Sequence, residues 1–181
     1  TRVSSSAASD VYKRQVKDSG IKTFIIHARK GILKGLSPRQ NRNIPPLNYE
    51  KVYSIKNDFP NLEIVINGGI KSISEAKNHL NYVDGVMLGR AAYDNPYMLS
   101  EIDSEIYSNA KTDISRKDLL SEYLDYVHLM TEKGYDPKIM LKHVFGLKKG
   151  EKDAKRFRVK VTEVMRSPSL VENKDELLSM V

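Results

Sequence analysis

The sequence contains no cysteine, so it has no disulfide, no thiolate metal site and no thiol catalyst. It has no apolar run of the roughly 18–20 residues that span a bilayer. Its N-terminus also lacks the apolar segment of a secretory signal. Apolar residues still make up 40% of the 181 residues, which suffices for a packed core. We therefore expect a cytoplasmic protein with no metal site and no membrane partner.

Positive charge is in excess and lies mainly in two segments. The net charge is +7; residues 22–51 hold seven Lys or Arg against one acidic residue, and residues 135–166 hold ten against four. Residues 52–134, between them, are acidic, with eight Lys or Arg against 13 Asp or Glu. This distribution favours a polyanion held at two places. The alternative is that the basic residues are only solvated surface.

The first 15 residues differ from the rest of the chain. They are rich in Ser and Ala and show neither helical nor strand periodicity. We expect residues 1–15 to be a non-native leader, with native sequence from near Val16.

Three short apolar runs predict strands, at Thr23–His27, residues 62–67 and residues 85–88. Each is unbroken and rich in aliphatic residues, which is typical of a strand buried on both faces. Residues 72–80, between the second and third runs, begin with Ser72 and have Glu75 three positions later, the spacing of a capping box. A strand, a helix and a strand in succession indicate a parallel sheet.

A helix is also predicted between the first two strands, over Tyr49–Asp58, and Pro60 ends it. Beyond Gly89 the pattern is helical throughout. Helices are expected over residues 91–107 (interrupted at Asn95–Pro96), 115–133, 137–148, 151–166 and 174–180. The apolar stripe of the second of these comprises Leu119, Leu120, Tyr123, Tyr126, Val127 and Met130.

These elements predict an α/β piece over residues 16–108 followed by an all-α domain over residues 109–181. Three parallel strands cannot close a (β/α)₈ barrel, which needs roughly 200–250 residues. The α/β piece is therefore either an open layer or the last part of a larger barrel. The abrupt start near Val16 favours the larger barrel.

Two glycine-containing turns follow the second and third strands, at Asn67-Gly68-Gly69 and at Gly89-Arg90. Glycine lets backbone N–H groups approach an anion closely, and the helices that begin after each turn favour negative charge there. In (β/α)₈ barrels a phosphate commonly lies at the loops after strands seven and eight. We therefore expect these turns to bind a phosphate, although ordinary tight turns would use the same residues.

His27 ends the first strand at the edge where both glycine turns lie, so it is a candidate cofactor contact or a structural histidine. The connection after it, residues 28–49, is much longer than the two to six residues usual for such loops. We expect an ordered binding loop whose basic residues contact phosphates. They are Arg29, Lys30, Lys34, Arg39 and Arg42.

One face of the predicted helix over residues 151–166 is basic. Lys152, Lys155, Arg158 and Thr162 recur at intervals of three and four. Such a face is often only solvated. Its combination with a basic loop elsewhere in the chain favours nucleic acid.

The motifs FIIHARK, LKGLSP and IPPL, then INGGI, DGVMLGRAAYDNP and H-x-x-G-L-x-x-G, resemble the dihydrouridine synthase family, in particular its A-type tRNA-dihydrouridine(20/20a) synthases. The resemblance covers residues 16–181 with the motifs in order. It implies a TIM barrel with FMN at its mouth, a helical tRNA-binding domain, and a monomer at full length. The three strands would be the last three of the barrel.

The resemblance also implies roles for single residues. FMN would be contacted by His27, Asn67, Gly68, Gly69, Gly89 and Arg90. Transfer RNA would be contacted by Arg42 and Pro45 in the long loop and by Lys155, Arg158 and Val161 in the helical domain.

The implied reaction reduces the C5–C6 bond of uridine 20 or 20a in the D-loop, with NADPH as reductant and a cysteine as proton donor. This chain has no cysteine, so we expect no catalytic residue in it and no activity from it alone. Two alternatives remain: another phosphate-binding TIM-barrel enzyme, and a non-catalytic RNA-binding module.

Overall fold

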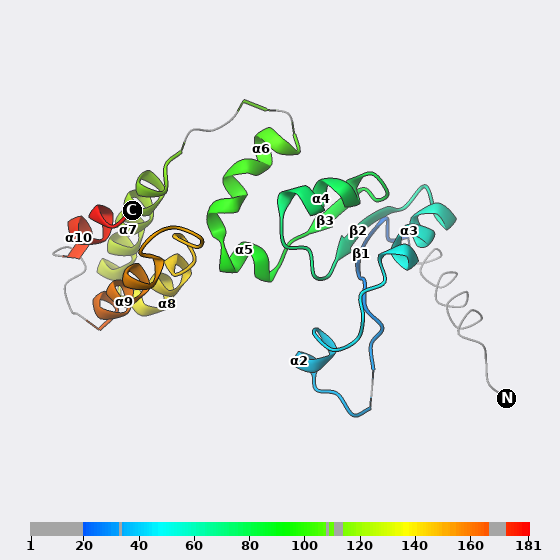
Figure 1. Ribbon diagram of the computed structural model, residues 1–181, viewed down its shortest axis with the longest axis horizontal. Coiled ribbons are helices and arrows are strands. Elements are labelled where there is room, and N and C mark those ends of the chain that lie inside the picture. The colour runs from blue at the N-terminus through cyan, green and yellow to red at the C-terminus, as the bar shows by residue number, and fades with distance from the viewer. Residues whose placement is uncertain (1–19, 33, 108, 111–113, 167–172) are drawn as a thin grey trace. The chain divides into compact units, whose positions relative to one another are not determined.

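The computed structural model describes residues 20–32, 34–107, 109–110, 114–166 and 173–181 (Figure 1). The expected leader, residues 1–15, lies outside the described residues. The chain divides into two compact units. The strand unit comprises Thr1–Ile70 and Ser74–Leu88, and the helical unit comprises Lys71–Ile73 and Gly89–Val181. Residues 89–107, which the sequence assigns to the α/β piece, are part of the helical unit in this division; the domain bounds stay a prediction.

The strand unit contains one three-stranded parallel sheet, as the sequence predicted. The strands are β1 (Thr23–His27), β2 (Glu63–Asn67) and β3 (Gly85–Met87), in the order β1-β2-β3. Phe24 pairs with Ile64 and His27 with Asn67 across the first two strands. Because the strands are parallel, their carboxyl ends lie at one edge of the sheet.

Two helices connect the strands: α3 (Tyr49–Asp58) and α4 (Ile73–Leu80). The strands follow one another in sequence order, so right-handed crossovers place both helices on the same face. Ile64 and Ile66 of β2 are 1% and 0% exposed on that face, and Val52 of α3 is also buried. This layer of aliphatic side chains is the core of the strand unit.

The opposite face of the sheet is open. Ile25 of β1 and Met87 of β3 are 55% and 40% exposed, and Ile25 lies beside Val65 in the strand register. The expectation that the strands are buried on both faces is therefore wrong for the described part of this chain. The reason is topological, because both crossover helices lie on the other face and no described segment covers this one.

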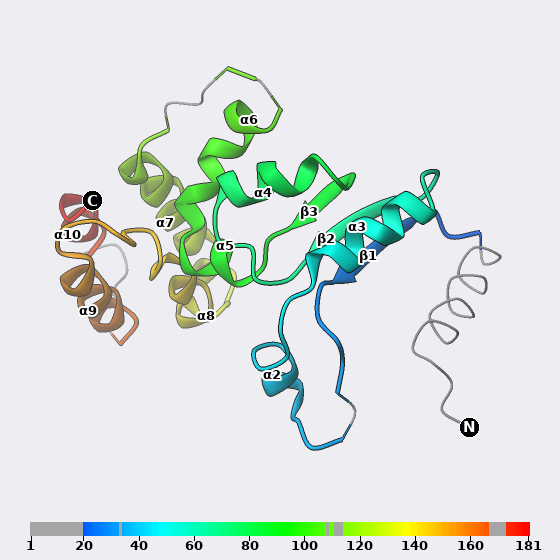
Figure 2. The same ribbon diagram turned by 45° about the vertical axis from the view of Figure 1, so that its right-hand side comes forward.

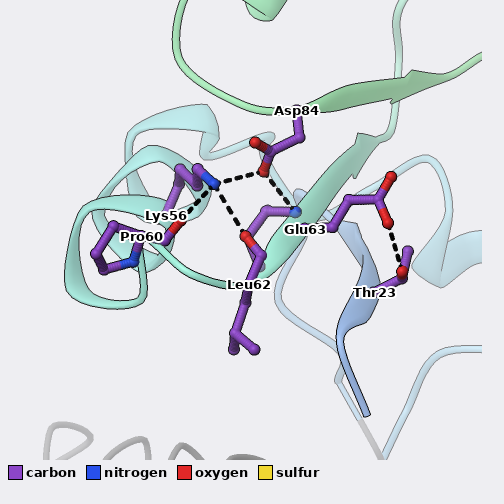
Figure 3. A network of polar contacts seen from close by, with 7 residues as sticks. Thr23, Lys56, Pro60, Leu62, Glu63 and Asp84 are labelled. Carbon is purple, nitrogen blue, oxygen red and sulfur yellow. Dashed lines mark hydrogen bonds and ion pairs between the residues drawn. The ribbon is translucent and has the colours of Figure 1, made fainter.

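A polar network holds the amino-terminal edge of the sheet (Figure 3). The Lys56 ammonium lies 2.7 Å from the Asp84 carboxylate and donates to the carbonyls of Pro60 and Leu62. Asp84 also accepts from the Ile64 backbone N–H at 2.8 Å. Burial raises the pKa of the Asp84 carboxyl, but the Ile64 and Lys56 contacts outweigh burial and hold its pKa below the ordinary value. The network thus ties α3 and the start of β3 to the middle strand.

A buried histidine joins the two crossover helices. His79 is 7% exposed, its Nδ1 lies 2.6 Å from the Tyr53 hydroxyl, and Tyr49 packs edge-on against its ring. Burial lowers the pKa of His79, and the nearby Glu75 carboxylate only partly opposes this. The imidazole is therefore neutral in the folded protein at neutral pH.

We expect the free energy of unfolding to fall as the pH drops from about 7.5 to 5.5. The unfolded chain protonates His79 near its ordinary pKa of about 6.5, whereas the folded chain resists protonation because its pKa is lower. The stabilisation is thus complete above the unfolded pKa and declines as the pH falls below it. Urea titrations of the 181-residue chain at several pH values measure this effect.

The matched variants are His79→Gln, which should flatten the pH dependence, and His128→Gln, which should leave most of it. His128 is half exposed in an ion pair with Glu132. An unchanged slope in His79→Gln would show that other groups cause the loss.

The helical unit begins with three short elements and continues with a helical bundle (Figure 2). The first three are α5 (Arg90–Asp94), the 3₁₀ turn η1 (Pro96–Glu101) and α6 (Ile102–Glu105), so the predicted break at Asn95–Pro96 is present. The bundle comprises α7 (Arg116–Glu132), α8 (Pro137–Leu141), η2 (Lys142–Val144), α9 (Ala154–Val164) and α10 (Lys174–Ser179). Its core includes Leu120, Leu124, Val127, Leu141, Phe157, Val161 and Leu177.

Local sequence explains where these helices begin. Ser115 caps α7 in a capping box with Asp118, and Asp136 caps α8 through the Lys138 N–H. The predicted helix over residues 137–148 is shorter than expected, because the chain tightens into a 3₁₀ turn at Lys142. Likewise, α9 starts at Ala154 because Asp153 has a left-handed φ of 61°.

Candidate functional site

His27 and Asn67 lie side by side at the carboxyl edge of the sheet. They are paired in the register of β1 and β2, and they share the alternation of Ile25 and Val65, so both belong to the open face. The Asn67 side chain is partly buried and makes no hydrogen bond within the described part of the chain. An unpaired amide at a strand end is well suited to receive a ligand.

The turn after Asn67 requires glycine twice. Gly68 and Gly69 have φ values of 124° and 75°, which other residues rarely adopt. A Cβ on Gly69 would lie 2.5 Å from Leu47, and one on Gly68 would lie 3.3 Å from the His27 ring. The turn is thus packed between the first strand and the end of the long loop, and Tyr49 donates to the Gly68 carbonyl at 2.9 Å.

Gly89 and Arg90 follow the third strand in a different setting. Gly89 precedes α5, and a Cβ there would meet nothing within 4 Å. Packing therefore does not require glycine at this position, in contrast to Gly69. Arg90 is exposed at the first position of α5. This helix has five residues, so any effect on an anion comes mainly from the guanidinium.

The long loop over residues 28–49 is ordered by its own side chains. Ser37 and Gln40 form a capping box at the short helix α2 (Pro38–Asn41). The Asn41 amide exchanges two hydrogen bonds with the Ile32 backbone, at 2.8 and 2.9 Å. The loop closes at its base, where Asn48 N–H donates to the Ala28 carbonyl at 2.8 Å. The described part of the loop projects from the sheet (Figure 1).

Two candidate residues in this loop point inward. The Arg29 guanidinium donates to the carbonyls of Asn43 and Pro45, so it holds the loop together. Pro45 is buried within the described chain, and its contact with RNA stays a prediction. The remaining basic residues of the loop are exposed: Lys30, Lys34, Arg39 and Arg42.

Helix α9 presents its basic residues to solvent. Lys155 and Arg158 are exposed on one face, whereas Phe157 and Val161 on the opposite face are 0% exposed. Val161 therefore packs in the core of the helical unit, and its contact with RNA stays a prediction. Lys152 lies before the helix, in the turn that ends at Asp153.

The sequence analysis missed a basic pocket in the helical unit. Tyr93 and Asp94 of α5 line it together with Lys142, Lys149 and Arg158, and its volume is about 310 Å³. The sequence signal was the Gly146 of H-x-x-G-L-x-x-G. A Cβ on Gly146 would lie 2.4 Å from the Asp94 carbonyl oxygen, so glycine permits the close approach that shapes the pocket.

Two further searches cover only the described residues. None of their helices is both long and apolar enough to cross a membrane. No three His, Asp or Glu side chains among them gather in a way that could hold a metal ion.

Comparison with known proteins identifies the class. The model of the family described as "Dihydrouridine synthase (Dus)" matches residues 5–180. The chain belongs to the dihydrouridine synthase family.

Three relatives of this chain have the same protein name. A tRNA-dihydrouridine(20/20a) synthase of Pseudomonas putida is 46% identical over 80% of this chain and 43% of its own length. The enzymes of the same name from Pseudomonas aeruginosa and Vibrio cholerae are each 43% identical, over 80% and 82% of this chain. The chain spans less than half the length of these relatives, 43–46%.

Proposed function

We propose that this chain is the C-terminal part of an FMN-dependent tRNA-dihydrouridine(20/20a) synthase. The full protein would reduce the C5–C6 bond of uridine 20 or 20a in the tRNA D-loop with NADPH, as a cytoplasmic monomer. The observation that carries the proposal is the carboxyl edge of the sheet. There His27 and Asn67 lie together on an open face beside a turn whose positive φ values favour glycine.

The open face of the sheet supports a barrel in the full protein. Side chains on the inner face of a (β/α)₈ barrel pack against those of other strands. Ile25 and Met87 are aliphatic but exposed here, and contact with further strands would bury them. The single layer of crossover helices on the other face matches the outer ring of such a barrel. The three strands would be its sixth, seventh and eighth.

The residues at the strand ends fit a flavin phosphate. The Gly68-Gly69 turn keeps side chains away from its backbone, and the Asn67 amide has no other partner within the described chain. Strands β2 and β3 are neighbours, so Gly89 and Arg90 leave the sheet one strand away from this turn. We assign Asn67, Gly68, Gly69, Gly89 and Arg90 to the phosphate and His27 to the flavin. Bound FMN would supply the hydride for C6 of the base.

This chain's residues would also position the RNA. Arg42 is exposed on an ordered loop of the strand unit, and Lys155 and Arg158 are exposed on α9 of the helical unit. Phosphate contacts of this kind set the register of an RNA without reading its sequence. A uridine inside folded RNA must leave its stack to be reduced. Contacts from both units would hold the tRNA while that happens.

Arg90→Ala should weaken FMN binding in the full-length protein by roughly 1.5–3 kcal/mol, the value of a charge-assisted hydrogen bond. This corresponds to about a 10- to 100-fold increase in Kd. Arg90→Lys should give a smaller loss, because it keeps the charge without the planar fork. Fluorescence titration of the apoprotein with FMN measures both, and an unchanged Kd for Arg90→Ala would remove Arg90 from the site.

The proposed function is tested by dihydrouridine formation on unmodified tRNA with NADPH. The full-length protein containing this sequence should purify with a flavin absorption spectrum and convert one or both D-loop uridines. A protein that binds tRNA without flavin would instead be the non-catalytic RNA-binding module.

A further inference from the structure

We propose that the basic pocket of the helical unit is a subsite for one nucleotide of a bound RNA. In this subsite Lys142, Lys149 and Arg158 hold the backbone phosphate, and Tyr93 packs against the sugar or base. The inference rests on the proposed function and deepens it, because it adds Lys142, Lys149 and Tyr93 to the RNA contact proposed at Arg158. The pocket and all its lining residues lie within the helical unit.

Close packing builds the pocket. The segment after η2 touches the end of α5 at Gly146, where a Cβ would lie 2.4 Å from the Asp94 carbonyl oxygen and 2.8 Å from its carbon. Any larger residue would separate the two segments. The close approach brings Tyr93 of α5 to the same pocket as Lys142 and Lys149, while α9 supplies Arg158. A volume of about 310 Å³ is at the lower end of known ligand pockets.

The positive charges that line the pocket are not neutralised by its own acidic residue. Three cations line it against one carboxylate, and Lys149 lies 4.0 Å from Asp94, a long ion pair. Lys142 and Arg158 have no acidic partner among the described residues. An unpaired cluster of this kind attracts an anion.

Three other cations of the helical unit are paired with carboxylates, in contrast to Lys142 and Arg158. Lys160 lies 2.5 Å from Glu176, Lys174 lies 2.5 Å from Asp125, and Arg116 lies 3.2 Å from Glu151. Part of the unbalanced positive charge of this unit therefore lies where the surface is hollowed.

The aromatic ring favours a nucleotide over a bare anion. Tyr93 is 57% exposed, and His143 packs edge-on against it, with ring centroids 5.7 Å apart and planes at 90°. This packing fixes the tyrosine ring and leaves ring surface free for stacking. Base–aromatic stacking tolerates any sequence and is worth about 1–3 kcal/mol per base. Lys155, one turn before Arg158 on α9, extends the basic surface beyond the pocket.

The test uses residues that the proposed function does not otherwise need. In the full-length protein, Lys142→Gln with Lys149→Gln should weaken tRNA binding by about tenfold at physiological salt. The slope of log K against log salt should fall by about one, because one RNA phosphate is no longer neutralised. Tyr93→Ala should weaken binding without changing the slope, whereas Tyr93→Phe should behave as the unchanged protein. Lys174→Gln is the matched control, because its charge is already paired with Asp125.

Fluorescence anisotropy across a salt series, together with dihydrouridine formation, separates the outcomes. Normal tRNA affinity and slope in the lysine double variant of an active synthase would overturn the subsite and leave the proposed function standing. A reduced slope in a protein that makes no dihydrouridine would support the subsite and overturn the proposed function. Loss of affinity in Lys174→Gln equal to that of the pocket variant would also overturn the subsite, since removal of any lysine would then suffice.

Discussion

The isolated 181-residue chain should form no detectable dihydrouridine on unmodified tRNA, even with added FMN and NADPH. Reduction of the C5–C6 bond requires a proton at C5 as well as a hydride at C6. The family resemblance implies that a cysteine supplies the proton, and this chain contains none. Loss of a general acid alone lowers rates by about 10²–10⁴-fold. The open face of the three-stranded sheet should reduce the rate further, because it leaves the flavin site incomplete.

The measurement is mass spectrometry of tRNA digests after incubation, with the full-length protein as the positive control. A tRNA-binding assay on the same preparation of the short chain shows whether its helical unit is folded. Turnover by the short chain would contradict the prediction, and another residue in it would then have to donate the proton.

The order and type of the elements were predictable from sequence, because local patterns determine them. The aliphatic runs became β1, β2 and β3, and Ser115 with Asp118 marks the start of α7 as a capping box should. What the runs could not reveal is which face of a strand is covered. Ile25 reads as a core residue but is 55% exposed, because its burial depends on segments other than its own.

The same dependence on other segments explains where the predicted and observed core residues of the helices differ. The predicted stripe of α7 included Tyr126, which is 49% exposed, and omitted Leu124, which is 1% exposed. The side chains of Leu124 and Tyr126 lie about 160° apart around a helix with 3.6 residues per turn. Contacts with the neighbouring helices therefore determine which of the two is buried. Val161 and Phe157 are four residues apart on α9, and both pack in the core. The sequence did not predict the pocket, because residues from three separate elements, α5, η2 and α9, line it together.

Changing Lys155 and Arg158 together to Ala should weaken tRNA binding by the full-length protein about 10- to 100-fold at physiological salt. Each residue is exposed on α9, without an acidic partner among the described residues. The salt slope should fall by about one to two, because Lys155 neutralises its own phosphate whereas Arg158 shares one with Lys142 and Lys149. Flavin reduction by NADPH, measured by stopped-flow without tRNA, should keep its rate because that half-reaction does not involve RNA.

Two comparisons locate the role of these residues more sharply. Lys160→Ala is a control on the same helix. Lys160 is paired with Glu176 at 2.5 Å, so this variant should leave the salt slope unchanged.

Arg42→Ala, in the ordered loop of the strand unit, should lower kcat for dihydrouridine formation more than it weakens tRNA binding, because we expect Arg42 to place the target nucleotide. A residue that only orients the tRNA body affects KM and leaves kcat alone, as uniform binding does. The double variant on α9 should therefore be rescued by high tRNA concentration and Arg42→Ala should not. Normal binding with an unchanged salt slope in the double variant would reduce the α9 surface to a solvated face.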